Sequence, residues 1–191
     1  MRGTARGDDK AMSKKEFAEF ISRQGSPVVR NERPVDWVAQ KNEWLQYLND
    51  LYQMVETFLK EYVESQQIAI EYKNIELTEE DIGRYTAKVM TLLFGANKIT
   101  LTPIGTLLIG TKGRVDMTSP RGTVRLLLAD KDSTGLKITV RAANTPTVEE
   151  VPKPINWEWK TAVMNAPGRM ISYQKLTQET FFNAIMELSN G

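Results

Sequence analysis

The chain has 191 residues with a net charge of +1, and it contains neither histidine nor cysteine. Those two side chains supply the imidazole and thiolate groups of zinc sites, haem ligation, thiol redox chemistry, and Cys–His and Ser–His–Asp hydrolases, so the composition excludes these classes. Chemistry by carboxylates, lysine, tyrosine or magnesium remains, as does binding without chemistry. The sequence indicates no catalytic residue, metal ligand or cofactor, and it favours a protein that is not an enzyme.

A chain of this length fits one domain with a sizeable core. Hydrophobic residues make up 41% of it and charged residues 26%, as in ordinary globular proteins. No apolar run approaches the roughly 20 residues of a membrane span, and the N-terminus lacks the apolar region of a signal peptide. We therefore expect a soluble, cytoplasmic protein without a membrane partner.

Residues 1–34 mix Gly, Ser, Pro and charged residues without sustained periodicity, which predicts a flexible N-terminal arm. Residues 8–12 (DDKAM) resemble the remainder of a cloning site, so we interpret residues 1–11 as vector-derived. Residues 35–191 then form a single α+β domain.

Residues 36–66 show the strongest helical pattern of the chain, with apolar residues at spacings of three and four. At about 1.5 Å per residue this helix is on the order of 45 Å long, longer than most sheets are wide. Part of its apolar face should overhang the sheet and need a cover, either a second subunit or the N-terminal arm. The aromatic-rich face comprises Trp37, Trp44, Leu48, Leu51, Val55, Phe58 and Tyr62.

The pattern then changes from helical to alternating. Residues 68–72 predict a strand, residues 77–82 resemble a capped helical turn, and residues 85–94 fit either a strand or a helix, of which we favour the strand. Residues 98–142 contain short strands separated by turn residues, which is typical of an antiparallel meander. A two-residue loop at Pro120 and Arg121 would place Met117 opposite Val124 and Asp116 opposite Arg125, although a bulge at Gly122 would shift this pairing by one.

Residues 155–160 predict a further strand, which could return to pair with an early one, and a last helix runs from Thr177 to about Leu188. The expected fold class is therefore α+β. A long N-terminal helix and a short C-terminal helix pack on a curved antiparallel meander sheet of about six to eight strands. The sequence leaves open whether this sheet closes on itself.

Charge is distributed unevenly, since residues 35–95 carry five basic and eleven acidic residues and residues 96–143 carry eight and three. The basic half offers an anion-binding set on one sheet face, Lys112, Arg114, Arg121 and Arg125. A cross-strand ion pair of Asp116 with Arg125 on a solvated face explains the same residues structurally. Residues 95–143 contain no aromatic residue on which bases could stack, so a nucleic-acid partner is not favoured.

The leading functional hypothesis is a non-enzymatic interaction or accessory module that associates through the aromatic-rich helix face, with a second copy of itself or with another protein. The first alternative is an anionic-ligand or nucleic-acid binding protein that uses the basic set. The second is a small-molecule cup lined by the four tryptophans, for which core packing is the simpler explanation.

Overall fold

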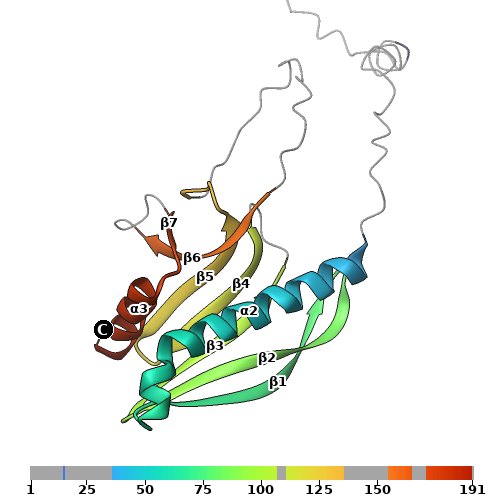
Figure 1. Ribbon diagram of the computed structural model, residues 1–191. Helices are drawn as coiled ribbons and strands as arrows, with labels where there is room; N and C mark the ends of the chain where they lie inside the picture. Colours follow the sequence, from blue (N-terminus) through green and yellow to red (C-terminus); the bar gives the residue numbers. More distant parts are fainter. Residues whose placement is uncertain (1–14, 16–35, 107–110, 136–154, 165–170, 191) are drawn as a thin grey trace, which may run out of the picture. The chain divides into compact units, whose positions relative to one another are not determined.

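The computed structural model describes residue 15 and residues 36–106, 111–135, 155–164 and 171–190. Along the chain follow α2 (Trp37–Glu64), β1 (Ala69–Glu79), β2 (Gly83–Phe94), β3 (Asn97–Gly105), β4 (Thr111–Ser119), β5 (Gly122–Asp130), β6 (Trp157–Met164), β7 (Ile171–Lys175) and α3 (Gln178–Asn190). The strands form one antiparallel sheet in the order β1 to β7, and α2 and α3 pack against it (Figure 1). This confirms the predicted fold class, and the described strands form an open sheet of seven.

The predicted N-terminal arm lies outside the described residues apart from Lys15, and the division into an arm and a single domain stays a prediction. Within the described residues, no helix is both long and apolar enough to cross a membrane.

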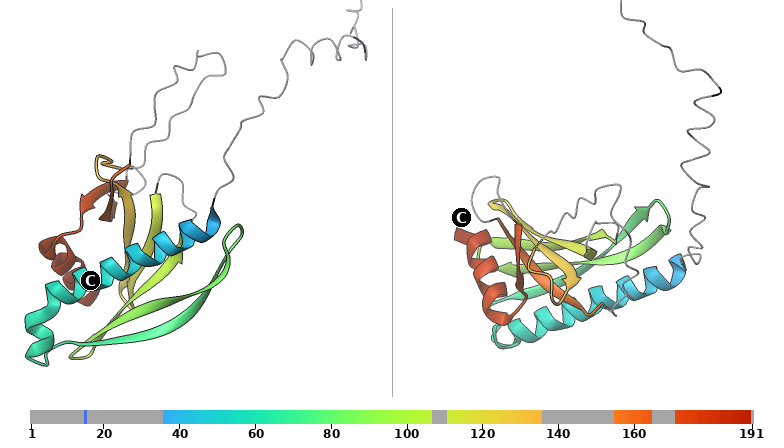
Figure 2. Two further views of the ribbon diagram at one scale, coloured as in Figure 1. Left: turned by 45° about the vertical axis from the view of Figure 1, so that its right-hand side comes forward. Right: turned by 90° about the horizontal axis from the view of Figure 1, so that it is seen from above.

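Helix α2 begins and ends close to the predicted positions. Its N-cap is Asp36, whose Oδ1 accepts a hydrogen bond from the Ala39 backbone N–H at 2.9 Å. It ends at Glu64 with Ser65 as its C-cap, and Gln66 then adopts a positive φ of 57° where the chain turns toward the sheet. The apolar spacing turns one face of α2 onto the sheet, and Figure 2 shows the strands curving around it.

The structure confirms two predictions about the sheet, and it corrects a predicted helical turn and the predicted partner of a strand. Residues 85–94 lie in β2, and the β4–β5 hairpin has the predicted unshifted register, with Asp116 opposite Arg125. The predicted helical turn over residues 77–82 is wrong, because Leu77 pairs with Tyr85 inside the β1–β2 hairpin. Strand β6 pairs with β5 and β7 rather than with an early strand, and β7 was not predicted.

Helix α2 approaches strand β4 closely at Trp44. This side chain is fully buried, and a Cβ added to Gly113 on β4 would lie 2.2 Å from Trp44 Cζ3. Trp159 on β6 packs beside it, with ring centroids 6.1 Å apart, and donates from Nε1 to the Tyr47 carbonyl at 3.1 Å. Glycine is therefore the residue that allows the indole to lie on the strand.

We predict that Gly113→Ala lowers the free energy of unfolding by about 1–3 kcal/mol, because the new methyl group must displace a fully buried ring. Urea denaturation measures this change. The matched control is Gly122→Ala, where the new Cβ would meet only Leu188 Cδ2, at 3.8 Å. Equal losses in the two variants would contradict the assignment of Gly113 to a close-packing role.

Candidate functional site

The four predicted anion-binding residues differ in the partners that they have within the described structure. Lys112 donates to Glu43 on α2, with Nζ 2.7 Å from Oε2. Arg114 binds Asp116 through two parallel hydrogen bonds, Nε to Oδ1 and Nη2 to Oδ2, each 2.6 Å long. Two of the four cations thus have carboxylate partners within the domain.

Asp116 is therefore paired with Arg114, whereas the sequence predicted an ion pair with Arg125. The hydrogen bonds that Arg114 donates to Asp116 raise the pKa of the Arg114 guanidinium, and partial desolvation opposes this rise. Arg121 lies exposed in the β4–β5 turn, and Arg125 is also exposed. Neither side chain forms an ion pair with another described residue.

The predicted partner-interface residues on α2 divide into two groups. Trp44, Leu48, Leu51 and Val55 are buried against the sheet of their own chain. Phe58 is partly buried beside Phe181, Tyr62 remains 39% exposed with its ring edge-on to Phe182, and Trp37 is partly buried. A partner could reach only the second group without unfolding the domain.

The tryptophan-lined cup has no counterpart among the clefts that we describe. Trp44 and Trp159 pack into the core, and neither of the two clefts below contains a tryptophan. The smaller cleft, of about 220 Å³, lies between α2 and the β1–β2 hairpin. There, the Tyr52 hydroxyl already donates to the Lys88 carbonyl.

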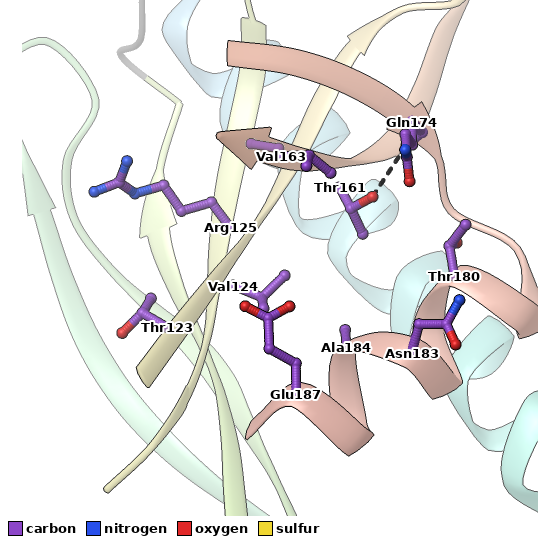
Figure 3. A pocket seen from close by; sticks show the side chains of 11 residues that line it. Thr123, Val124, Arg125, Thr161, Val163, Gln174, Thr180, Asn183, Ala184 and Glu187 are labelled. Atoms are coloured by element: carbon purple, nitrogen blue, oxygen red, sulfur yellow. Dashed lines mark hydrogen bonds between the residues drawn. The ribbon is translucent and has the colours of Figure 1, made fainter. Parts of the chain in front are cut away.

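The larger cleft, of about 350 Å³, opens where β5 and β6 separate. The two strands pair from Asp130–Trp157 only as far as Arg125–Ala162, although β5 begins at Gly122 and β6 continues to Met164. Helix α3 lies across the opening (Figure 3). Strands β5, β6 and β7 and helix α3 all contribute side chains to this cleft.

The start of α3 fixes one wall of the cleft. The Thr180 N–H donates to Thr177 Oγ1 at 3.2 Å, and the Thr177 N–H donates to Thr180 Oγ1 at 2.8 Å. This reciprocal cap confirms Thr177 as the predicted helix start. Phe181, Ala184 and Leu188 are buried, which orients the polar flank with Asn183 and Glu187 toward the cleft.

Three polar side chains of the cleft are exposed and have no hydrogen-bond or ion-pair partner among the described residues: Gln174, Asn183 and Glu187. The Glu187 carboxylate points between α3 and the separated strands, whereas the Arg125 guanidinium points away from α3 (Figure 3). Val124, Val163 and Ala184 add apolar surface. The described lining of the cleft therefore combines the Glu187 carboxylate with the Arg125 guanidinium, neutral amides and hydroxyls, and a short apolar wall.

Sequence reasoning missed this cleft. The available signal was the spacing of Thr180, Asn183 and Glu187, which puts three polar residues on one flank of the last helix. The separation of β5 from β6 leaves no comparable signal in the residues of either strand.

A second polar cluster joins the end of β1 to the end of β3. The Tyr85 hydroxyl donates to Glu79 Oε1, and the Thr106 backbone N–H and hydroxyl donate to Glu79 Oε2 at 2.8 Å and 2.7 Å. A Cβ on Gly105, whose φ is +138°, would lie 2.9 Å from Glu79 Cδ. All of these contacts are internal, so we assign the cluster to holding the sheet together.

Comparison of this chain with protein families, curated proteins and solved structures gives no match.

We predict that stability falls as the pH rises above about 10, where tyrosine ionises in an unfolded chain. Burial raises the pKa of Tyr52 and Tyr85, and the Glu79 carboxylate raises that of Tyr85 further. The folded state therefore favours the neutral phenols, and their stabilising contribution is complete below pH 10 and is lost above it. Urea midpoints at pH 8–11 measure this loss. Tyr85→Phe should show a smaller loss, and an unchanged pH dependence would contradict the prediction.

Proposed function

We propose that this protein is a non-enzymatic binding module, and that the cleft between β5, β6 and α3 receives a ligand carrying an ammonium or guanidinium group. The observation that supports this most is the Glu187 carboxylate, which points into the cleft without an ion-pair partner among the described residues. A cation from the ligand would supply that partner.

The other lining groups match the rest of such a ligand. The Asn183 and Gln174 amides can donate to carbonyl or hydroxyl oxygens, and Val124, Val163 and Ala184 can contact a methylene chain. A volume of about 350 Å³ suits a small molecule or one long side chain. The ammonium group could belong to a free amine or to a basic residue of a peptide.

The lining favours binding over catalysis. Proton-transfer catalysis generally pairs an acid with a base. Among the described lining residues, Glu187 is the only carboxylate, and the other polar side chains are amides, hydroxyls and the Arg125 guanidinium, which points away from α3. The described lining therefore gives Glu187 no second acid–base group as a neighbour.

Association through α2 remains a proposal, and it would involve Trp37, Phe58 and Tyr62, the predicted interface residues that a partner can reach. Polyanion binding is less favoured, because Lys112 and Arg114 already have carboxylate partners. The cytoplasmic location expected from the sequence also stays a proposal.

The test is a titration of the protein with N-acetyl-lysine methylamide, N-acetyl-arginine methylamide, putrescine and N-acetyl-norleucine methylamide, followed by the methyl NMR signals of Val124 and Val163. We expect the charged probes to bind and the neutral norleucine probe to bind less. Putrescine alone would indicate a small amine, whereas the amino-acid probes alone would indicate a peptide.

Glu187→Gln keeps the shape of the side chain and removes its charge, so it should weaken binding about 10- to 100-fold, the usual effect of one charge-assisted hydrogen bond. Glu179→Gln is the matched control, because Glu179 lies on the same helix outside the cleft. Equal binding by the Glu187 variant and the unchanged protein, or no binding of any probe at millimolar concentration, would overturn the proposal.

A further inference from the structure

Strand β1 forms one edge of the sheet, as Figure 1 shows. It has 11 residues and pairs with β2 from Ala69 to Glu79 without a register shift. No other described strand pairs with its outer side, and it contains neither proline nor a bulge. Long, regular edges of this kind present free backbone N–H and C=O groups to another strand, and natural proteins usually protect them.

The opposite edge has such protection. Strand β7 has only five residues, and its Tyr173 N–H donates to the Thr134 carbonyl at 2.9 Å. The segment that covers it is held in place by buried Lys160, whose Nζ donates to the carbonyls of Lys131 and Ser133, both at 2.7 Å. The two edges of one sheet therefore differ, and only β1 is left open within the described chain.

An exposed aromatic residue is the fourth of the eleven residues of the open edge. Tyr72 packs against Tyr52 on α2, with ring centroids 5.7 Å apart, and its hydroxyl donates to Glu56 at 2.6 Å. Even so, the side chain remains 43% exposed. Since Tyr72 faces α2, its neighbours Glu71 and Lys73 face the other side of the sheet.

The charges of β1 select one register for pairing with a second copy. A two-fold axis perpendicular to the sheet keeps every side chain on its own face, so each residue lies opposite one an even number of positions away. The register with Tyr72 opposite Tyr72 pairs residues 69–75 of the two copies. Among these antiparallel registers, it is the only one that places an acidic residue of β1 opposite its lysine without any like charges opposite each other. It forms two Glu–Lys pairs and one tyrosine pair, all of which stabilise neighbouring strands.

We propose that two copies of this chain associate through β1, antiparallel and centred on Tyr72, so that the two sheets continue into one another. The inference does not involve the cleft at α3. It identifies the partner as a second copy, because the charges of β1 complement their own two-fold image.

Sedimentation equilibrium over a range of protein concentrations tests this proposal. We expect a monomer–dimer equilibrium whose dissociation constant rises about 10- to 100-fold in Lys73→Glu, where each ion pair becomes a pair of like charges. The double variant Glu71→Lys with Lys73→Glu exchanges the charges and should restore the constant to within about threefold of the original. Neither residue forms an ion pair inside the described chain, so both variants should fold, which circular dichroism checks.

The matched control is Lys98→Glu, which makes the same charge change at an exposed position of β3, away from the edge. A monomer at every concentration would overturn the proposal and leave the edge to a strand of another protein. A dimer that responds equally to Lys73→Glu and Lys98→Glu, or that the double variant does not restore, would overturn it as well.

Discussion

The contact of the Trp44 indole with the Gly113 backbone sets the distance between α2 and the sheet. A side chain of any size at position 113 would push the helix away, and the neighbouring contacts depend on this approach. Trp159 reaches the Tyr47 carbonyl of the helix backbone, and Lys112, next to Gly113 in the β4 bulge, reaches Glu43. One residue without a side chain thus allows a helix of 28 residues to lie directly on a curved sheet.

Contacts with the C-terminal part of α2 fix the position of α3. Phe181 packs against Phe58 with ring centroids 5.9 Å apart, and Gln178 Nε2 donates to the Phe58 carbonyl at 3.2 Å. These contacts hold α3 across the gap between β5 and β6 and turn its polar flank toward that gap. Helix α3 carries Glu187 and forms one wall of the cleft, and its contacts with α2 hold it opposite β5 and β6. Since α2 also packs against the sheet that contains these strands, the cleft depends on the whole domain.

Some of the acidic and basic residues of the two oppositely charged halves form ion pairs inside the domain. The acidic half contains Glu43 and the basic half contains Lys112, and these two side chains meet across the helix–sheet interface. Arg114 and Asp116 neutralise one another within a single strand. These pairs reduce the positive surface that the sequence suggested, whereas Arg125 stays exposed. Glu187 is the only carboxylate among the described residues that line the cleft.

The sequence alone determined the fold class, the limits of α2 and the start of α3, because each depends on local periodicity or capping. It narrowed the register of the β4–β5 hairpin to two pairings, and the structure shows the unshifted one. It missed β7, whose five residues show little apolar alternation, and it mistook the end of β1 for a helical turn, since pairing with Tyr85 overrides the local pattern. Only the tertiary structure decided which face of α2 remains accessible, where β5 and β6 separate, and which sheet edge stays open. Each of these depends on contacts between residues far apart in the chain, such as Trp44 with Gly113 and Phe58 with Phe181, and local sequence patterns do not encode such pairings.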